Sequence, residues 1–375
     1  MTFLIFLIVL GALVFVHELG HFLVAKKAGV RVDEFGFGYP PRALIIGKKW
    51  GTLFTLNWIP FGGFVKIFGE NYEEGTPPLA PSPLQGEGVG DEVGKNFTQV
   101  SKKWQATILA SGVIFNIIFA WFLFSLGFMI GLPTSVENDF GAAVKNPVLT
   151  IIDILPDSPA QKVGLKTGDK VKSLSLDNGN VPRELNPESV SNFINNSASQ
   201  ISMEINRGKE VLNFKLTPET GMVENKKIIG ISMDMVGILS LPVHKAIYEG
   251  GRTAFKITYL TAGGLLNLIK NAARGEADIS NVAGPVGIVG LVGDASRLGL
   301  AYLITFTALI SVNLAIINLI PFPALDGGRI IFVAIEGITK KTINPKIAQI
   351  LNTAGFALLI ILMLIVTYRD ILRLF

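Results

Sequence analysis

The stretch "LVFVHELGHFLVAKK", residues 13–27, places two histidines and one glutamate inside an otherwise apolar run that begins at about Thr2. Lys26 and Lys27 end the run. A helix over residues 2–25 would be about 36 Å long at about 1.5 Å per residue, which is enough to cross a hydrocarbon layer of about 30 Å. The stretch therefore predicts a membrane-spanning helix with polar side chains at bilayer depth.

The composition of the whole chain agrees with this prediction. Of 375 residues, 49% are hydrophobic and 17% are charged, and the mean hydropathy is +0.48. These values are too apolar for an ordinary soluble enzyme. Three further runs, at about 104–132, 300–320 and 347–368, are also long enough to span. We predict an α-helical polytopic membrane protein with about four spans, a β-rich membrane-associated hairpin region and one inserted α+β domain.

The predicted spans divide the chain into segments. They occupy residues 1–27, 104–132, 300–330 and 347–370, and between them lie a β-rich hairpin region (28–70), a flexible linker rich in Pro and Gly (71–103), the α+β domain (144–220) and an amphipathic or linker region (221–299). In the last of these, Arg252, Lys256 and Lys270 favour an interfacial helix over a fifth span. The loop "NVAGPVGIVG", residues 281–290, could gate access to a site.

Charge and cysteine usage exclude some functions. The net charge is only +4, and the lysines flank apolar runs instead of forming a basic face, so we expect no nucleic-acid partner. The chain has no cysteine, so a metal would need nitrogen and oxygen ligands. The first run lacks a basic n-region and a small-residue cleavage site, which favours a retained helix over a signal peptide.

Lysines at the ends of the spans predict the orientation. Those that we place on the cytoplasmic side are Lys26, Lys27, Lys102, Lys103, Lys340, Lys341 and Lys346. Both termini and the segment from about 133 to 299 then lie outside, although Arg369 and Arg373 at the outer end of the last span oppose this assignment.

His17, Glu18 and His21 form an HExxH pattern. Residues i and i+4 of a helix share a face, so both imidazoles can reach one zinc ion and leave room for a third protein ligand and a water. Glu18 can take the proton of that water as it attacks a peptide carbonyl. The alternative is that the histidines only hydrogen-bond other helices in the core.

A third ligand is expected at the same depth. The segment "SVNLAIINLIPFPALDGGRI", residues 311–330, supplies Asp326 just past the third span. Pro321 and Pro323 should end the helix there, and Gly327 and Gly328 should permit a tight turn. An aspartate before two glycines can also be an ordinary loop residue, but beside HExxH we predict that Asp326 is a ligand.

"VHELGH", "NLIPFPALDGGR" and the segment between the second and third spans resemble the site-2 proteases, and more narrowly the bacterial regulator-of-sigma-E protease group of intramembrane zinc metalloproteases. The resemblance implies that His17, His21 and Asp326 bind Zn²⁺ and that Glu18 is the catalytic base. It also implies a single-span membrane protein as substrate, cut within or near the bilayer after another protease has removed its outer domain.

The hairpin region allows two interpretations. Residues 29–69 contain short β-rich runs with "GKKWG" as a turn. They could form a cytoplasmic hairpin, or, as the resemblance suggests, a β-element that dips into the membrane near the metal. In the second case an edge strand could pair with the unwound substrate.

Three asparagines lie in the predicted spans. We expect Asn116, Asn313 and Asn318 to be buried amides that bind substrate backbone or join helices, and for Asn116 helix packing is favoured. The resemblance favours a substrate-binding role for Asn318 and Pro323, and we predict the same role for Asn313.

The outer segment resembles a PDZ domain. Its features are "ILPDSPAQKVGLKTGDKVKSL", residues 154–174, and β-rich runs on either side. A groove between an edge strand and the helix of such a domain can take an extended peptide, or the domain can act only as a steric filter. The chain has one such unit, whereas well-known relatives in the group have two. His244 has no partner at ligand spacing and is expected to be an ordinary polar side chain.

The sequence thus predicts an intramembrane zinc endopeptidase in the bacterial cytoplasmic membrane, with its active site near the cytoplasmic side and an outward PDZ domain. A non-catalytic membrane scaffold and a zinc carrier are the alternatives. Neither of them needs Glu18 between two histidines.

Overall fold

The computed structural model describes residues 1–70, 94–137, 143–197, 199–208, 210–220, 227–276 and 283–372. Most of the predicted flexible linker, at 71–93, lies outside these residues. The chain forms two compact units: residues 1–124, 251–293 and 306–375 make the first, and residues 125–250 and 294–305 make the second.

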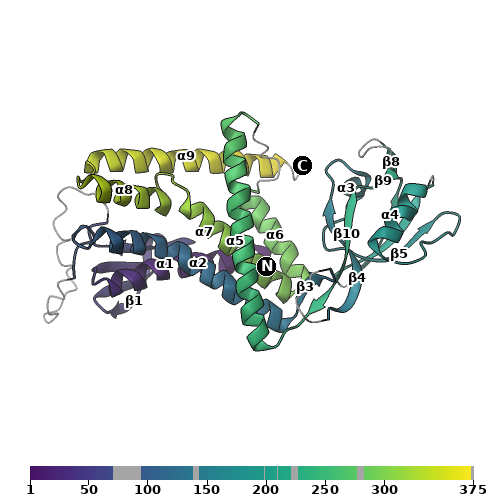
Figure 1. Cartoon of the computed structure of the whole chain (residues 1–375), viewed down its shortest axis with the longest axis horizontal. Helices are drawn as coiled ribbons and strands as arrows, with labels where there is room; N and C mark the ends of the chain where they lie inside the picture. The colour runs from purple at the N-terminus through teal and green to yellow at the C-terminus, as the bar shows by residue number, and fades with distance from the viewer. Residues whose placement is uncertain are drawn as a thin grey trace. The chain divides into compact units, whose positions relative to one another are not determined.

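Within the described residues, four helices are long and apolar enough to cross a membrane: α1 (Thr2–Lys27), α2 (Lys102–Ile130), α7 (Leu300–Leu319) and α9 (Pro345–Leu372). A helix pairs its backbone groups internally, which is the condition for crossing a hydrocarbon layer. In the first unit the axes of α1, α2 and α9 are roughly aligned, with α1 and α2 antiparallel (Figure 1). The chain is therefore a polytopic membrane protein that also contains β-sheets.

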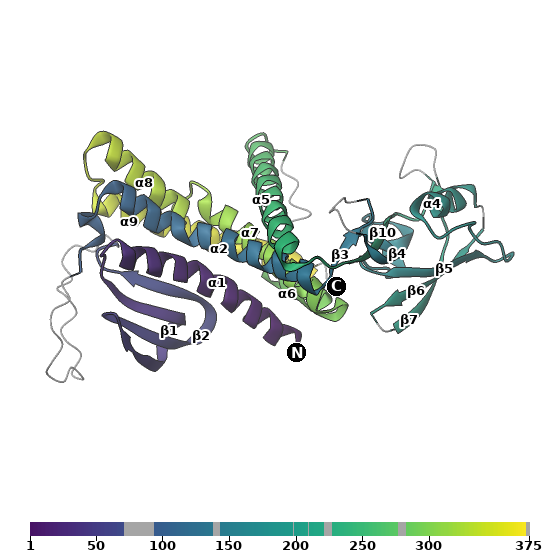
Figure 2. The same ribbon diagram turned by 60° about the horizontal axis from the view of Figure 1, so that its bottom comes forward.

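A long β-hairpin lies beside α1 (Figure 2). It consists of β1 (Val32–Lys49) and β2 (Thr52–Ile67), joined at Trp50 and Gly51, which both have positive φ angles. Two such residues form the tight turn that suits a twisted hairpin. Both strands bend, so residues 34–37 of β1 pair with residues 53–56 of β2 on one side and with residues 63–66 on the other. Residues 63–66 thus form an outer strand of a small curled sheet.

An apolar core joins the hairpin to the helices. Its buried side chains come from α1, both strands of the hairpin, α2 and α8 (Asp326–Thr339), and include Phe22, Val32, Ile67, Leu109 and Val333. Apolar contacts on this scale hold the hairpin in a defined place against the first helix.

A bent loop connects α7 to α8. The helix α7 ends at Leu319, before Pro321, and Ala324 has a φ of 76°. Gly327 and Gly328 do not form the predicted turn, because they lie in the first turn of α8. They are needed there for close approach: a Cβ on Gly327 would collide with the carbonyl oxygens of Leu319 and Ile320.

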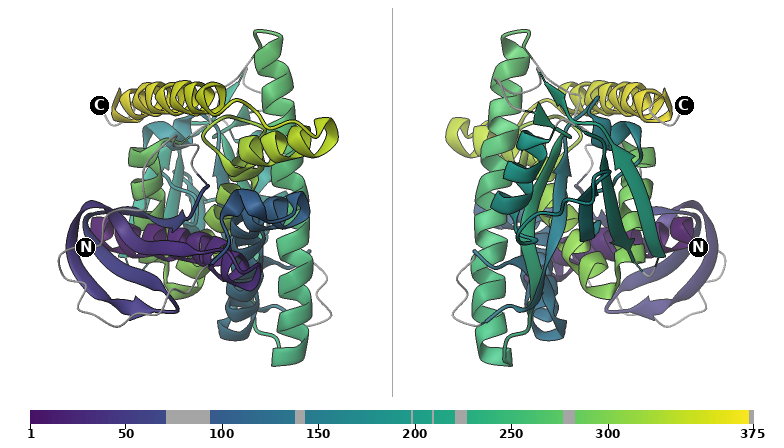
Figure 3. Two further views of the ribbon diagram at one scale, coloured as in Figure 1. Left: turned by 90° about the vertical axis from the view of Figure 1, so that its left-hand side faces the viewer. Right: turned by 90° about the vertical axis from the view of Figure 1, so that its right-hand side faces the viewer.

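Two further helices lie mostly in the first unit. They are α5 (Val243–Ala273) and α6 (Pro285–Leu298). The part of α5 in the first unit runs crosswise to α9 (Figures 1 and 3), and its exposed face includes Phe255, Tyr259 and Leu260. The helix is not one of the four that meet the criteria for a span.

The second unit is built on a six-stranded antiparallel sheet with the order β3-β10-β4-β5-β6-β7. Its strands are Leu132–Ser135 (β3), Lys145–Ile154 (β4), Lys170–Leu176 (β5), Ile201–Arg207 (β6), Glu210–Leu216 (β7) and Ile231–Leu239 (β10). The helices α3 (Pro159–Lys162) and α4 (Pro187–Asn196) and a two-stranded sheet of β8 (Glu219–Thr220) and β9 (Lys227–Ile228) complete it. The core of this unit is apolar, with Ile151, Val190, Ile201 and Met203 fully buried.

Candidate metal centre

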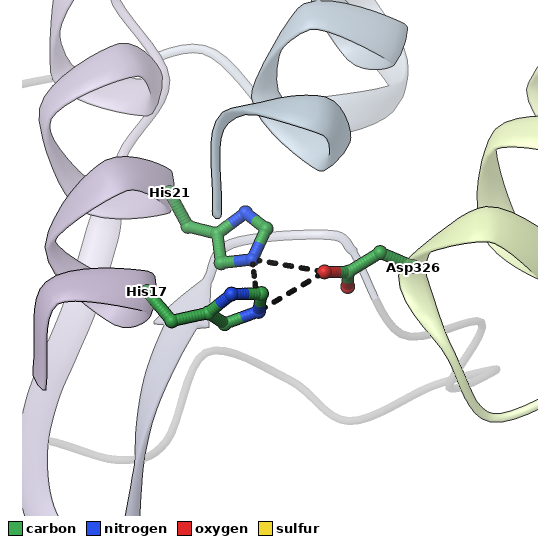
Figure 4. Close-up of side chains that lie close together, drawn as sticks. All are labelled: His17, His21 and Asp326. Atoms are coloured by element: carbon green, nitrogen blue, oxygen red, sulfur yellow. Dashed lines mark hydrogen bonds and ion pairs between the residues drawn. The ribbon is translucent and has the colours of Figure 1, made fainter. Parts of the chain in front are cut away.

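Three side chains from two helices converge inside the first unit (Figure 4). His17 and His21 are both buried on one face of α1, and their Nε2 atoms are 3.2 Å apart. The Oδ2 atom of Asp326 lies 3.1 Å from Nε2 of His17 and 3.3 Å from Nε2 of His21. Residues 309 positions apart in the sequence thus present three ligand-type atoms to one point.

These separations fit a zinc ion. Zinc bonds to nitrogen and oxygen are about 2.0–2.1 Å long, and at tetrahedral angles they separate the ligand atoms by about 3.3 Å. The side-chain distances of 3.1–3.3 Å agree with this value. Two imidazoles and one carboxylate are also the donor set of a catalytic zinc site, which keeps its fourth position open. The residues present therefore fit the metal.

The helix α2 passes close to the three side chains. A Cβ built on Gly112 would collide with Nε2 of His21 and would lie 2.8 Å from Nε2 of His17. A Cβ on Gly20 of α1 would lie 2.6 Å from the backbone oxygen of Ser111. Two glycines therefore let the helices approach closely, as small residues do in membrane proteins. The role of Gly112 was missed from the sequence, where the small residues of "ASGV" at 110–113 were the available signal.

A backbone carbonyl on α2 orients one of the histidines. Nδ1 of His21 lies 2.8 Å from the oxygen of Ile108. A carbonyl oxygen can only accept a hydrogen bond, so Nδ1 carries the proton and Nε2 presents its lone pair to the cluster. No residue type in the sequence could reveal this contact, because the atom belongs to the backbone.

The helix α9 supports the loop that leads to Asp326. The side-chain oxygen of Asn352 accepts a hydrogen bond of 3.3 Å from the backbone N–H of Ala324. Gly355 faces the same loop, since a Cβ there would lie 2.8 Å from Cβ of Pro323. Asp326 itself is the first residue of α8, where the helix dipole stabilises a negative charge.

Glu18 lies between α1 and the hairpin. It follows His17 on the helix and is half-buried. A Cβ on Gly63 would lie 3.5 Å from Cγ of Glu18, so the outer strand of the small sheet passes directly beside this side chain.

The predicted substrate-binding residues are not all buried as expected. Asn313 is exposed, so the prediction of a buried amide was wrong for this residue, and Asn318 is half-buried. The reason is that α7 buries a stripe through Ala308, Val312 and Ala315, and Asn313 lies to one side of it. Pro323 is half-buried and packs against Gly355. Asn116 is fully buried, as predicted.

A cavity of about 240 Å³ with both polar and apolar lining residues lies between α2, α8 and α9. Two ion pairs line it: Arg329 with Glu70 at 2.7 Å and Lys102 with Glu336 at 2.5 Å. Arg329 is three residues beyond Asp326, so α8 contributes one residue to the cluster and others to the cavity.

The fold and the cluster define a membrane metallohydrolase class, and the sequence comparisons name the family. Peptidase family M50 matches residues 5–362, so the chain belongs to this family. A Clostridium perfringens protein that carries the provisional name of a zinc metalloprotease is 33% identical, with 98% of this chain and 97% of the relative covered. The Bacillus subtilis "Regulator of sigma-W protease RasP" is 30% identical over 100% of this chain and 99% of the relative, and the Geobacillus kaustophilus "Zinc metalloprotease RasP" is 27% identical over 99% and 97%.

These findings confirm the predicted resemblance to the site-2 proteases, the predicted zinc cofactor and the predicted enzyme class. The protein is a zinc metalloendopeptidase of the membrane. The alternative predictions of a non-catalytic membrane scaffold and a zinc carrier were therefore wrong.

Proposed function

We propose that His17, His21 and Asp326 hold the zinc ion and that Glu18 is the catalytic base of an intramembrane endopeptidase. The observation that carries the proposal is the convergence of two imidazole nitrogens and one carboxylate oxygen at 3.1–3.3 Å. When bound at these residues, zinc supplies a Lewis acid that polarises a carbonyl and makes water acidic. Glu18, on the next position of the same helix, accepts the proton of the attacking water on its carboxylate and returns it to the leaving amine.

The substrate is a single-span membrane protein that is cut within or near the bilayer. A helix hides its peptide bonds, so the segment must unwind before attack. Residues 63–66 of β2 form an outer strand beside Glu18, and an outer strand can pair with an extended peptide and hold its backbone straight. This arrangement supports the membrane-dipping interpretation of the hairpin region, residues 28–70.

Asn313, Asn318 and Pro323 are proposed to contact the substrate. An exposed asparagine in a membrane span is costly against lipid, and Asn313 is exposed on α7. A substrate backbone would satisfy its amide, since peptide groups offer both donors and acceptors. Asn318 and Pro323 follow it toward the loop that leads to Asp326.

We further propose that the second unit is a PDZ-like domain that controls substrate access. Its antiparallel sheet and the helix α4, which buries Val190 and Ile194, support this assignment. It acts by binding an extended peptide or by excluding proteins that still carry a large outer domain. The name of the Bacillus relative refers to sigma-W regulation, which supports an anti-sigma factor as the substrate and regulated intramembrane proteolysis as the process. A remnant signal peptide has the same single-span chemistry.

The proposed location is the bacterial cytoplasmic membrane, with the metal site near the cytoplasmic side and the second unit outside. Lys102 at the start of α2 pairs with Glu336 near the end of α8, which is followed by Lys340 and Lys341, so these two helix ends lie together. Such positive flanks are typical of the cytoplasmic side. The crosswise course of α5 and its exposed aromatic side chains support an interfacial position for that helix.

Glu18→Gln tests the proposal. Purified wild type and the variant would be assayed for zinc content and for cleavage of a single-span substrate that lacks its outer domain. We expect about one zinc per chain in both, with cleavage reduced at least about 10²–10⁴-fold in the variant, because the base is lost and the ligands remain. Normal turnover by the variant, or no zinc in either protein, would refute the assigned roles.

A further inference from the structure

In each histidine, the protonation of Nδ1 decides whether the Nε2 atom can bind a metal. An imidazole that offers the lone pair of Nε2 carries its proton on Nδ1, and a buried Nδ1–H needs an acceptor. For His21 this acceptor is the backbone oxygen of Ile108. For His17 the group within reach of Nδ1 is the side-chain amide of Asn116, at 3.3 Å.

The Asn116 amide lies in a fully buried position on α2. Its nitrogen end faces His17, and its Oδ1 atom has no hydrogen-bond partner in the part of the chain that the structure describes. In this orientation the amide would donate to Nδ1, which would leave the imidazole proton on Nε2, pointing at His21 and Asp326. Turning the amide by about 180° exchanges its two ends without changing its shape, pairs Oδ1 with Nδ1–H and frees the Nε2 lone pair.

One face of α2 contacts both histidines. Ile108, Gly112 and Asn116 are spaced four residues apart and therefore share a face of the helix. Ile108 contacts His21, Gly112 faces both imidazoles, and Asn116 contacts His17. The order is reversed along α1, as antiparallel packing of the two helices requires. This face thus places a hydrogen-bonding group behind each imidazole and a glycine against both of them.

We propose that Asn116 is a positioning residue whose side-chain carbonyl accepts the Nδ1–H of His17, so that Nε2 of His17 is aimed at the zinc ion. This inference rests on the zinc site proposed above. An amide suits the role because it is neutral: a carboxylate would accept equally well but would add a buried charge.

A contribution of Asn116 to helix packing can be separated from its role toward His17. The backbone oxygen of Asn116 accepts a hydrogen bond of 2.8 Å from the hydroxyl of Ser311 on α7. That contact does not involve the Asn116 side chain, so it survives a substitution at residue 116. Conversely, Ser311→Ala removes the bond between α2 and α7 and leaves the amide on His17.

The test measures zinc affinity by competition with a chromogenic chelator in detergent, without any assay of cleavage. The parent is Glu18→Gln, which retains the ligands and cannot digest itself. Asn116→Leu, which has a similar shape and no acceptor, should weaken zinc binding about 10–100-fold. Asn116→Asp, whose side chain only accepts when ionised, should stay within about threefold of the parent. Ser311→Ala should also stay within about threefold.

Three results would overturn the inference. They are zinc affinity of Asn116→Leu within about threefold of the parent, Asn116→Asp as weak as Asn116→Leu, or Ser311→Ala as weak as either. If the leucine variant does not fold, Asn116→Asp decides alone: retained affinity supports the acceptor role, and a loss beyond about tenfold refutes it. Absence of zinc from the Glu18→Gln parent would instead refute the proposed metal site, so the two failures are distinguishable.

Discussion

The helices α1 and α9 have almost the same length and apolar character, yet they occupy different environments. They contain 26 and 28 residues, and both meet the criteria for a membrane span. Inside the protein, 33% of the apolar window of α1 is buried, against only 6% for α9. The helix with His17, Glu18 and His21 is therefore the inner one, whereas α9, which has no polar side chain from residue 354 to 366, faces outward. Polar side chains at bilayer depth are tolerated only where other groups of the protein contact them.

The strongest test of this comparison exchanges one aspartate at a time. Asp326→Asn keeps the shape of the side chain but removes its charge, so zinc should fall below about a tenth of an ion per chain after dialysis against a chelator. Asp370→Asn is the matched control, because Asp370 is buried away from the cluster and accepts hydrogen bonds from the backbone of Gly284 and Gly287 at the far end of α9. That control should retain its zinc. Equal zinc content in Asp326→Asn and wild type would remove Asp326 from the metal site.

A smaller loss of zinc binding is expected from a substitution on α2 where this helix packs against the two histidines of α1. Gly112→Ala would place a methyl group against both imidazoles, and we expect cleavage to fall about 10²-fold and zinc to bind about tenfold more weakly. Gly263→Ala is the control, since a Cβ at that position of α5 meets nothing within 4 Å. Cleavage by the two variants would be measured on membranes with matched protein levels. A neutral Gly112→Ala would show that α2 does not shape the site.

The smallest effects are expected on α9, where two substitutions separate its inner and outer faces. Gly355→Val would press on Pro323 and move the loop that leads to Asp326, which should lower cleavage about tenfold. Leu364→Ala, at a side chain that is 58% exposed, should change cleavage less than about twofold, because substitutions away from packed sites have small effects. A large loss in Leu364→Ala would mean that the outer face of α9 is covered in the working enzyme.

Much of the site could be predicted because each part has its own local pattern. The spacing of His17 and His21 by one helical turn sets both on one face wherever the helix lies. Pro321 marks the end of α7 whatever surrounds it. Other features could not be predicted locally: the acceptor for His21 is a backbone oxygen, and Gly112 matters only because another helix passes it. The burial expected for Asn313 failed for the same reason, since apolar neighbours do not reveal which face of a span is covered.

The sequence by itself determined the number of helices that can span, the pair of histidines with Glu18 between them, and the position of Asp326 after a broken helix. These follow from hydropathy, helical spacing and proline, which act over a few residues. Only the tertiary structure decided that Asp326 meets the two histidines, that Asn116 and Ile108 lie behind them, and that the outer strand of the hairpin passes Glu18. Such contacts join residues far apart in the chain, and they depend on how closely the helices pack rather than on any local preference.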